Sequence, residues 1–476
     1  MIRGRLKKMI KKNDELEVEI IDNGFEGEGI ARVDEFVIFI PEAIVGEKVK
    51  IKILKVNKSI AYGKILEVIE SSHFRVQPDC ETYSKCGGCN LRHMDYQYSL
   101  EMKKKSVRNT LKKALKKEVE ISDIIGMENP CYYRNKLQYP VGCGANGELV
   151  MGVFANRSHR IIPTFDCKIQ NQVCQKVARE SFEFMKSHGI SGYHEETGTG
   201  LVRHIIVRMG VRTSEIMLIL VLNSWDFPYE REFIEFVTSK APEVKTIVKN
   251  LNDKNTNVIL GQENKVIFGD GYIFDYLGDK KFKISPLSFY QVNPVQTVKL
   301  YQRAVDYACL TGNETIFDLY CGVGTIGIFA SDKAKKLYGI ETIENAIKDA
   351  RENAKINNIE NAEFFVGDVE NVLPKFLEER NIKPDVVFID PPRKGCDKTA
   401  IQTLLEVEPN KIVYISCNPA TLARDLAIFE QKYEIKQISL CDMFPRNTDM
   451  WSVWQCLILN NFEIIATVWI DEFNVR

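Results

Sequence analysis

Short runs in which apolar and polar residues alternate fill the N-terminal part of the chain. Between positions 16 and 68, valine, isoleucine and phenylalanine alternate with charged residues, and Asp22-Asn23-Gly24 and Gly46 mark turns. Alternation with this period predicts β-strands that bury one face. About five such strands within about 55 residues are typical of a small closed barrel of the oligonucleotide-binding (OB) kind. We therefore expect residues 1–70 to form an OB-like β-barrel.

The pattern changes after about Gln291, where apolar strands alternate with helical stretches. The strand-like segments are TIFDLYCG, KKLYGIE, AEFFVGD, DVVFIDPP and KIVYISC. This alternation predicts βαβ units around a mostly parallel sheet, so an α/β domain is expected over residues 285–476. Residues 71–284 combine strand-like runs such as LVRHIIVRMG with a lysine-rich helical segment, and they are expected to form a mixed α+β domain.

Composition excludes several classes of protein and raises a question about cysteine. The 476 residues are 45% hydrophobic and 27% charged, which is ordinary for globular domains and excludes disordered, collagen-like and coiled-coil chains. The N-terminus has no apolar core followed by a small-residue cleavage site, and no run of about 18 apolar residues offers a membrane span. We therefore expect a soluble cytoplasmic protein with no membrane partner, in which 13 cysteines point to metal binding or catalysis.

The net charge of −1 hides two basic runs. Residues 1–12 carry six lysines and arginines and no acid. The second run is a lysine-rich helical segment that contains Lys103, Lys104, Lys105, Arg108, Lys112, Lys113, Lys116 and Lys117. Each run fits a nucleic-acid contact or simply a solvated terminus or helix face, and the pattern alone does not separate the two.

Three cysteines lie within ten residues, as Cys80-x5-Cys86-Gly-Gly-Cys89. The two glycines let the backbone wrap around an ion or cluster. A tetrahedral zinc or a cubane iron–sulfur cluster needs a fourth ligand, and Cys167 in a polar turn is the best candidate. The other candidates are Cys131, Cys143 and Cys174. Spacing alone leaves zinc, an iron–sulfur cluster and unligated buried thiols open.

A glycine-rich loop, DLYCGVGTIG at 318–327, follows a predicted strand and leads into a helix. Such a loop lets a ligand approach the backbone amides at the helix start. Glu341 ends the next strand, where a carboxylate can bind ribose hydroxyls, and Asp368 ends the one after it. Because the full dinucleotide glycine spacing is not matched, an adenosyl cofactor is favoured over NAD. The alternative is a set of turn glycines and helix-capping acids.

Two more strands end in residues suited to chemistry. Asp390 begins DPPRKG, whose prolines stop the strand and stiffen a loop at the carboxyl edge of the sheet. Cys417 lies in ISCNPATLARD at the end of the next strand, beside the same cleft. A thiol there can act as a nucleophile, although a lone cysteine is more often a core residue.

Together these segments resemble the bacterial RNA uracil-C5 methyltransferases, specifically the iron–sulfur, TRAM-domain-containing 23S rRNA (uracil-5-)-methyltransferases. The resemblance runs from about residue 12 to residue 445. It is carried by the barrel, the cysteine motif, YRNK (133–136), ISPLSFYQVN, DLYCGVGTIG, IDPPRKG and ISCNPATLARD. It implies a TRAM barrel, an iron–sulfur central domain and a Rossmann-like methyltransferase domain that depends on S-adenosylmethionine.

The resemblance also assigns roles to residues. It implies a [4Fe–4S] cluster on Cys80, Cys86, Cys89 and Cys167. It implies that S-adenosylmethionine is held by Gln291, Tyr320, Glu341 and Asp390, with Asp368 a weaker candidate. Cys417 becomes the nucleophile: its thiolate adds to C6 of uracil, so that C5 can take the methyl group, and a base then removes the C5 proton.

The implied substrate is a uridine in 23S rRNA, exposed in a loop or by base flipping. Transfer RNA enzymes of the wider family typically lack the barrel and the cysteine cluster, so ribosomal RNA is favoured. The barrel and the basic runs are interpreted as RNA-holding surfaces with salt-sensitive phosphate contacts. No obligate protein partner is expected.

The sequence departs from the family after Pro445. The family's C-terminal motif reads roughly Asp-Met-Phe-Pro-x-Thr-x-His-Val-Glu, and its glutamate is the proton-abstracting base. Here DMFP (442–445) is followed by RNTDMW, and Trp451 stands where the glutamate belongs. Entered at the third base of the Asn447 codon, the codons for NTDMWSVWQ can encode HRHVECVA. We therefore hypothesise a frameshift near 445–447, which makes 446–476 an out-of-frame tail; the alternative is a naturally diverged C-terminus.

The missing base has a chemical consequence. With Cys417 present and the base absent, methyl transfer proceeds but elimination stalls, so a persistent covalent protein–RNA adduct is expected. The alternative function is a catalytically impaired RNA-binding iron–sulfur protein.

Overall fold

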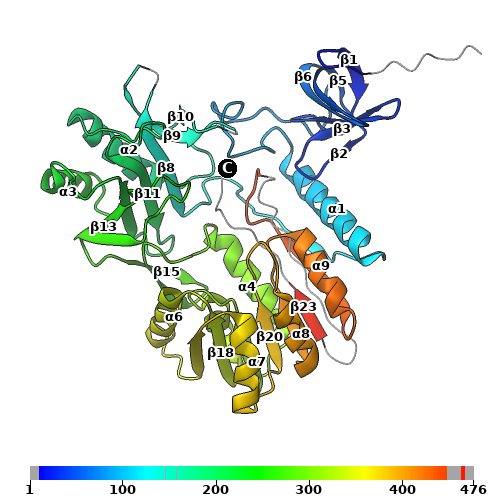
Figure 1. Ribbon diagram of the computed structural model, residues 1–476, viewed down its shortest axis with the longest axis vertical. Helices are drawn as coiled ribbons and strands as arrows, with labels where there is room; N and C mark the ends of the chain where they lie inside the picture. The colour runs from blue at the N-terminus through cyan, green and yellow to red at the C-terminus, as the bar shows by residue number, and fades with distance from the viewer. Residues whose placement is uncertain (1–9, 145, 157, 448–462, 467–476) are drawn as a thin grey trace, which may run out of the picture.

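The computed structural model describes residues 10–144, 146–156, 158–447 and 463–466. These residues form three main sheets, which Figure 1 shows as three separate bodies. A small barrel stands at the upper right, a seven-stranded sheet lies at the left, and an eight-stranded sheet wrapped by helices lies below them. Along the chain the barrel comes first, then the seven-stranded sheet and then the eight-stranded sheet, except that β7 (Asp123–Ile125) of the third sheet precedes the seven-stranded one.

The barrel is a six-stranded sheet in the order β1-β5-β6-β4-β3-β2. Alternate residues of its strands point inward, so Ile20, Ile38 and Ile51 are fully buried in its core. Its strands are β1 (Glu15–Glu19), β2 (Asp22–Asn23), β3 (Gly29–Val33), β4 (Phe36–Ile40), β5 (Lys48–Asn57) and β6 (Ile60–Glu70). The predicted N-terminal β-structure is therefore present, with one more strand than the alternation suggested.

The central sheet has seven strands in the order β10-β9-β8-β11-β12-β13-β14. Every residue of its two middle strands, β11 and β12, is buried, because the helices α2 and α3 pack on this part of the molecule. The elements are β8 (Lys136–Cys143), β9 (Leu149–Phe154), β10 (Ile161–Pro163), α2 (Gln172–Ser187), β11 (Val202–Met209), β12 (Ile216–Leu222), α3 (Glu230–Lys240), β13 (Val244–Leu251) and β14 (Glu263–Phe268). This is the mixed α+β region that was expected.

The third sheet has the order β19-β18-β17-β20-β21-β23-β22-β7, and all its neighbouring strands are parallel. The strand order reverses between β17 and β20, and in parallel sheets this switch point is where ligands bind at the carboxyl ends. The strands are β17 (Thr315–Leu319), β18 (Lys336–Glu341), β19 (Ala362–Val366), β20 (Val386–Ile389), β21 (Lys411–Tyr414), β22 (Glu434–Cys441) and β23 (Glu463–Ala466), with β7 (Asp123–Ile125) contributed by an earlier segment.

Helices cover both faces of this sheet, which makes it a doubly wound α/β fold. α4, α5 and α6 pack as one layer, and α7, α8 and α9 pack as the other (Figure 1). Their bounds are α4 (Pro294–Ala308), α5 (Thr325–Ala330), α6 (Glu344–Ile356), α7 (Val369–Arg380), α8 (Lys398–Val407) and α9 (Pro419–Phe429). A hairpin of β15 (Ile273–Leu277) and β16 (Lys280–Ile284) leads into this unit.

The helix α1 (Tyr96–Leu115) joins the barrel to the third sheet, because it contacts β2 at one end and packs against α9. Tyr98 donates a hydrogen bond from its hydroxyl to the Asn23 side chain at 2.7 Å. One prediction needs correction: Lys103 does not lie on an exposed basic face, because it is fully buried and forms an ion pair with the equally buried Asp442 at 2.7 Å. Its place on the inner face of the helix removes it from the RNA-facing set.

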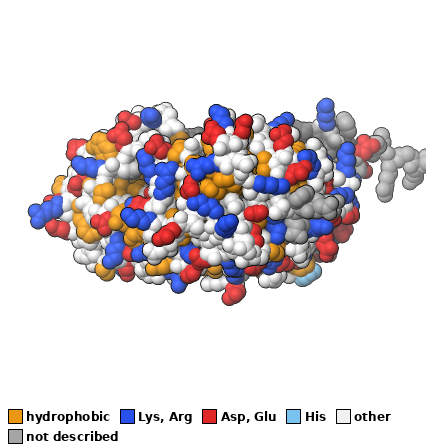
Figure 2. All heavy atoms as spheres, turned by 90° about the horizontal axis from the view of Figure 1, so that it is seen from below, with side chains coloured by type: hydrophobic (Ala, Val, Ile, Leu, Met, Phe, Trp, Pro, Cys, Tyr) orange, Lys and Arg blue, Asp and Glu red, His pale blue; other side chains and the backbone are white. Residues whose placement is uncertain are grey.

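Charges of both signs are interspersed over the surface. Figure 2 shows this for the lower face of the molecule, where lysine and arginine side chains lie among acidic ones with small apolar patches between them. The near-zero net charge therefore reflects local mixing as well as the basic runs. Within the described part of the chain, no helix is long and apolar enough to cross a membrane.

Candidate active site

The loop between β17 and α5 is the most tightly wound part of the sheet's carboxyl edge. Tyr320, Gly322 and Gly324 have φ angles of 63°, 55° and 79°, in the left-handed region. The Glu341 carboxylate, which ends β18, accepts hydrogen bonds from the backbone N–H of Gly322 at 3.1 Å and from that of Ile343 at 3.0 Å. This predicted ribose-binding acid thus lies directly beside the glycine-rich loop, and a positive φ at both glycines explains why larger residues are unsuited there.

Buried polar groups support this loop from below. Asp318 is fully buried, and its Oδ2 accepts a hydrogen bond from Gly327 N–H in the first turn of α5 at 2.8 Å. The pKa of Asp318 is raised to about 7: burial raises it most, the Gly327 hydrogen bond lowers it, and the neighbouring charge of Glu341 raises it. The carboxyl group therefore carries a proton over part of the neutral range and fixes the helix start.

Gln291 lies close to Tyr301, a residue that the motifs did not single out and that contacts the same edge of the sheet. The Gln291 side chain is 2% exposed, and its Oε1 has no hydrogen-bond partner among the described residues. A side-chain hydrogen bond with Gln291 lowers the pKa of Tyr301, although other causes raise it overall. The Tyr301 hydroxyl hydrogen-bonds Thr325 Oγ1 at 2.9 Å. Burial, and then the charge of Asp390, hold the pKa of Tyr301 above its usual value. Tyr301 thus connects Gln291, Asp390 and the start of α5.

The Asp390 loop is held against the loop that carries Tyr320. The Tyr320 hydroxyl lies 3.6 Å from Cys396 Sγ, within hydrogen-bonding distance for sulfur. The buried Asp425 carboxylate accepts hydrogen bonds from Cys396 N–H at 2.8 Å and from the Tyr414 hydroxyl at 2.7 Å. Burial raises the pKa of Cys396 to about 12, so this thiol stays protonated. Cys396 and Asp425 are positioning residues that the spacing of the motifs did not reveal.

Cys417 follows β21 and is almost completely buried, at 6% exposure. The next residue, Asn418, caps α9 by accepting a hydrogen bond from Ala420 N–H at 2.9 Å. The Asn418 side-chain amide also donates to the Arg393 carbonyl at 3.4 Å, which joins the Cys417 loop to the Asp390 loop. The thiol and the Asp390 carboxylate therefore end adjacent strands, β21 and β20, on loops that are hydrogen-bonded to each other.

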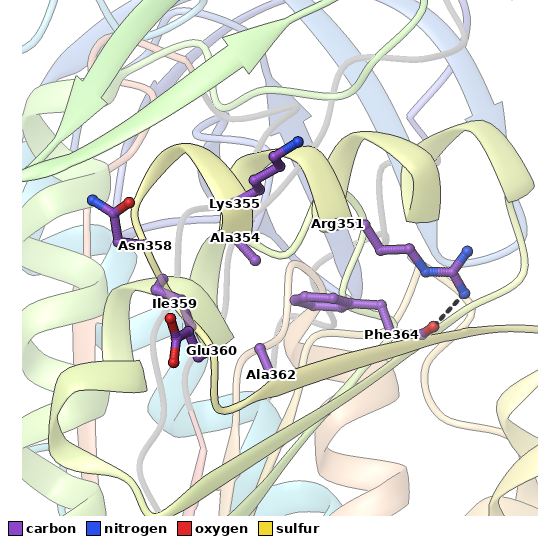
Figure 3. Close-up of a pocket in the computed structure, with 8 residues that line it drawn as sticks. All are labelled: Arg351, Ala354, Lys355, Asn358, Ile359, Glu360, Ala362 and Phe364. Carbon is purple, nitrogen blue, oxygen red and sulfur yellow. Dashed lines mark hydrogen bonds between the residues drawn. The ribbon is translucent and has the colours of Figure 1, made fainter.

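A hollow of about 320 Å³ lies elsewhere on the same domain. Figure 3 shows it between the end of α6 and the start of β19, where the Arg351 guanidinium donates to the Phe364 carbonyl at 2.6 Å. This position is the amino end of β19, opposite the carboxyl edge that carries Glu341 and Asp390. The ring of Phe364 also packs on Gly339 so closely that an added Cβ there would lie 2.4 Å from it. The hollow is therefore separate from the candidate cofactor edge.

The four candidate cysteine ligands lie near one another, although they come from two distant segments. Cys86 is influenced by the charges of Cys167 and Cys80, and Cys89 by those of Cys167 and Cys86. Burial, followed by this mutual repulsion, raises the pKa of Cys86 to about 11 and that of Cys89 to about 12. Without a bound cation, the thiols of Cys86 and Cys89 are therefore protonated.

The groups around these thiols favour thiolates, the form of cysteine that binds metal ions. Gly88 N–H donates to Cys86 Sγ at 3.2 Å, and the nearby Arg92 guanidinium lowers the pKa of Cys89. Four sulfur donors in a half-buried setting are the ligands preferred by zinc and by iron–sulfur clusters. Within the described residues, however, no three His, Cys, Asp or Glu side chains are arranged as the ligands of one metal ion. The four thiols are the kind of donor that zinc and iron–sulfur clusters take, but among the described residues the side chains are not arranged as ligands around one metal ion.

The segment 80–91, which we call the cysteine loop, is bonded to the turn that follows β22. The Asn447 side-chain amide donates to the Gly88 carbonyl at 2.7 Å. The Arg446 carbonyl accepts hydrogen bonds from Asn90 N–H at 3.2 Å and from Leu91 N–H at 3.1 Å. The cysteine loop therefore contacts the end of the DMFP motif, the place where the sequence departs from the family. Trp451 and Cys456 lie outside the described residues, so the position of the expected base does too.

Comparisons with known proteins agree with this arrangement. The family model described as tRNA (Uracil-5-)-methyltransferase matches residues 227–456, and the TRAM domain model matches residues 11–66. The chain is 48% identical over 440 residues to an uncharacterized RNA methyltransferase of Clostridium acetobutylicum, covering 92% of this chain and 95% of that one. It is 45% identical over 446 residues to one of Halalkalibacterium halodurans, covering 93% and 97%. The prediction of a TRAM barrel is thus confirmed.

A solved structure shares the architecture along most of the chain. The tRNA (uracil-54, C5)-methyltransferase of Pyrococcus abyssi, in complex with S-adenosyl-L-homocysteine, superimposes with a TM-score of 0.73 at 26% sequence identity. The match covers 91% of this chain and 98% of the archaeal one. A methyltransferase of known structure therefore has the same three-part arrangement.

Proposed function

Because the chain belongs to the RNA uracil-5-methyltransferase family, we propose that it methylates C5 of a uridine in 23S rRNA through a covalent bond from Cys417 to C6. The coarser assignment is firm: the protein is an S-adenosylmethionine-dependent RNA (uracil-5-)-methyltransferase. The observation that carries the finer proposal is the pair of loops in which Cys417 and Asp390 end adjacent strands beside the glycine-rich loop.

The residues at the sheet edge fit an adenosyl cofactor. We assign Gln291, Tyr320, Glu341 and Asp390 as its binding residues. The buried Gln291 Oε1 lacks a partner among the described residues, and such an atom calls for a ligand donor. The Glu341 carboxylate beside Gly322 suits ribose hydroxyls. When bound, S-adenosylmethionine supplies an electrophilic methyl group at this edge.

The chain's own chemistry centres on Cys417. Its thiolate adds to C6 of the uracil, and the electron pair of the C5–C6 double bond then makes C5 nucleophilic. After C5 has gained its methyl group, a base takes the C5 proton, the double bond re-forms, and the thiolate leaves. Because Cys417 lies at a buried strand end, the target base has to be exposed in a loop or flipped out to reach it.

The cysteine set forms the second part of the proposal. Cys80, Cys86, Cys89 and Cys167 would hold a [4Fe–4S] cluster, which would fix the cysteine loop to Cys167 of the central domain. What supports this is the donor chemistry: four neighbouring thiols, of which Cys86, Cys89 and Cys167 have pKa values raised by burial and by the charges of neighbouring cysteines. Iron–sulfur centres are held by cysteine thiolates of this kind. The organisation we propose is therefore a TRAM barrel at 1–70, an iron–sulfur domain at 71–284 and a methyltransferase domain at 285–476.

Ribosomal RNA is proposed as substrate because the sequence motifs resemble those of the 23S rRNA enzymes. The barrel does not separate rRNA from tRNA as the substrate, contrary to the expectation from sequence, because a tRNA methyltransferase covers 91% of this chain. The exposed cations of α1 support an RNA contact. Of the basic residues in this helix, Lys105 pairs with Asp22 and Lys112 pairs with Glu118. Arg108 and Lys113 are exposed, and no ion pair holds either of them in the described structure.

The missing base favours a second candidate function, a catalytically impaired RNA-binding protein. Trp451 stands at the expected position of the glutamate and cannot accept a proton. The family match ends at residue 456, so residues 457–476 lie beyond it. Under the frameshift hypothesis the tail after residue 446 is out of frame, and elimination stalls after methyl transfer. Sequencing the coding DNA across 444–455 tests this, because an unshifted frame in independent reads would rule the frameshift out.

The decisive experiment uses methyl-labelled S-adenosylmethionine with 23S rRNA and, separately, with tRNA. Turnover on 23S rRNA, mapped as 5-methyluridine by mass spectrometry, supports the enzyme. A single labelled protein–RNA adduct that survives denaturation supports the impaired form. Labelling of tRNA alone would overturn the proposed substrate, and labelling of neither RNA would overturn the proposed function.

A further inference from the structure

The barrel carries many of the chain's exposed large apolar side chains. They are Ile21, Phe25, Leu54, Ile60, Tyr62, Leu66 and Ile69. Three of these have a local explanation, because the register between β5 and β6 skips Leu54, Leu66 and Ile69. Each is the extra residue of a β-bulge, and a bulge turns such a residue away from the regular alternation. Tyr62 and Ile60 have no such explanation.

Tyr62 forms the centre of an outward-facing aromatic pair. It lies on β6, between β5 and β4, and is 42% exposed. Directly opposite it on β4 is Phe39, and the two rings are stacked, with centroids 5.9 Å apart and planes inclined by 29°. α1 contacts the barrel through β2, and Figure 1 shows β5 and β6 on the far side of the barrel from this helix. The outer face of the pair is therefore open.

The charges around this pair are not neutralised within the barrel. At one end of the β5–β6 face the lysines have acidic partners: Lys50 pairs with Glu15 at 3.0 Å, and Lys48 with Glu70 at 3.9 Å. At the other end Lys52 lies directly opposite Lys64. Neither takes part in an ion pair within the described structure, since Glu15, which faces Lys52 across β1, is bound by Lys50.

Lys55 completes this group, because it lies opposite Tyr62 on β5 and also has no ion pair in the described part of the chain. Like charges directly opposite each other in a sheet destabilise it. A barrel that places lysines around an exposed aromatic pair is therefore missing a counter-charge that a ligand can supply. We call Phe39, Tyr62, Lys55 and Lys64 the aromatic platform.

We propose that the aromatic platform binds an unpaired RNA nucleotide, whose base stacks on Tyr62 and whose flanking phosphates pair with Lys55 and Lys64. This inference rests on the proposed RNA-modifying function and adds the place and the kind of RNA contact. Stacking on an open aromatic face requires a splayed base, which a duplex does not offer. The platform therefore selects single-stranded RNA over duplex RNA.

The test compares matched variants of the full-length protein in anisotropy titrations with a fluorescein-labelled single-stranded ten-nucleotide oligouridine. Tyr62→Ala is expected to weaken binding by about five- to one-hundred-fold, the loss typical of one stacked base. Tyr62→Phe keeps the ring and is expected to bind as the parent does. Lys64→Gln is expected to lower the slope of log affinity against log salt by about 0.7.

Control variants separate the platform from general effects. Lys50→Gln removes a lysine that is already paired with Glu15, and Tyr229→Ala removes an exposed tyrosine of the central domain; both should leave the affinity unchanged. Circular dichroism and urea unfolding report whether Tyr62→Ala folds; if it does not, the salt dependence of Lys64→Gln compared with Lys50→Gln still decides. The proposal is overturned if Tyr62→Ala binds oligouridine as the parent does, or if Tyr62→Ala weakens the binding of a hairpin duplex of the same length as much as that of oligouridine. It is also overturned if Lys50→Gln and Lys64→Gln change the salt dependence of binding equally.

Its failure is distinguishable from that of the proposed function. If Tyr62→Ala binds oligouridine normally while the parent protein methylates rRNA or forms the adduct, only the platform is wrong. If Tyr62→Ala loses oligouridine binding but the parent protein labels neither 23S rRNA nor tRNA, the platform stands and the proposed function fails.

Discussion

Two regions of the molecule position their residues by different structural means. One is the carboxyl edge of the eight-stranded sheet, which we call the cofactor edge because we propose that it holds S-adenosylmethionine, and the other is the cysteine loop. At the cofactor edge, Glu341 ends a buried parallel strand, Tyr320 and Asp390 directly follow one, and Cys417 lies three residues after the end of β21. The cysteine loop lies between β6 and α1, outside every helix and strand, and its contacts include an isolated bridge from Cys86 to Ala155 and the bonds to Arg446 and Asn447.

The difference shows what each region needs in order to hold its geometry. A strand end is fixed by the backbone ladder and the core beneath it, so the cofactor edge is ordered before any ligand binds. The cysteine loop is held by turn hydrogen bonds within itself, such as Cys86 N–H to the Thr82 carbonyl at 2.8 Å, and by single bonds to other segments. Irregular segments of this kind open more easily than a strand ladder. A group bound by the loop's three cysteines together with Cys167 is therefore expected to stabilise the cysteine loop far more than a cofactor stabilises the sheet edge.

The largest effect that separates the two regions concerns Cys417. Cys417→Ser is expected to abolish the covalent protein–RNA adduct, because serine at this position has no thiolate to add to C6. Denaturing gel electrophoresis with radiolabelled rRNA measures this loss. Cys309→Ser, which changes an exposed cysteine at the end of α4, is the control and should form the adduct as the parent does. Persistence of the adduct in Cys417→Ser would assign the nucleophile elsewhere.

The buried ion pair between α1 and the DMFP turn tests how the two regions are joined. Lys103→Ala leaves the Asp442 carboxylate buried without its cation, and about 3–5 kcal/mol of unfolding free energy is expected to be lost. Urea denaturation monitored by circular dichroism measures the change. The double variant Lys103→Met/Asp442→Asn should recover most of it. A loss below about 1 kcal/mol in the single variant would mean that the junction is not held by this pair.

The two regions also differ in how far the sequence predicts them. The alternation of apolar strands and helices predicts the parallel sheet, and the motifs at its strand ends identify Glu341, Asp390 and Cys417 as neighbours, because carboxyl ends of parallel strands meet at one edge. Spacing did not reveal Tyr301, Cys396 or Asp425, since each acts through packing contacts between segments far apart in the chain. The same is true of the strand β7, which joins the third sheet from position 123.

For the cysteine loop, the motif predicts the thiols but not what holds them. The hydrogen bond between Asn447 and Gly88 joins residues 359 positions apart, and no local sequence pattern predicts it. The burial of Lys103 is a related case. Its charge placed it with the RNA-facing lysines, although helical periodicity puts it on the face that packs inward with Leu100 and Val107.

An intermediate effect concerns the protonation of Asp318 at the cofactor edge. The folded pKa of about 7 lies above the ordinary value, so the native state binds more protons than the unfolded state between about pH 4 and pH 7. Stability is therefore expected to fall as pH rises through this window, by about 3 kcal/mol in total. Asp318→Asn should remove this fall when unfolding free energies are measured at pH 4.5 and pH 7.5. An unchanged pH dependence would mean that the carboxyl group is ionised in the folded state.

The smallest expected effect probes the contact between the cysteine loop and the DMFP turn. Asn447→Ala removes the hydrogen bond to the Gly88 carbonyl, which is worth about 1 kcal/mol. Because no strand ladder supports the loop, the expected result is faster amide hydrogen exchange confined to residues 80–91 and 442–446, with the strands β17 and β20 unchanged. Asn418→Ala, which removes the matching contact at the cofactor edge, should leave exchange in β20 and β21 unaltered, since the ladder still holds both strands. Equal loosening of the two regions would contradict the distinction between them, because it would mean that the strand ends rely on side-chain contacts as much as the cysteine loop does.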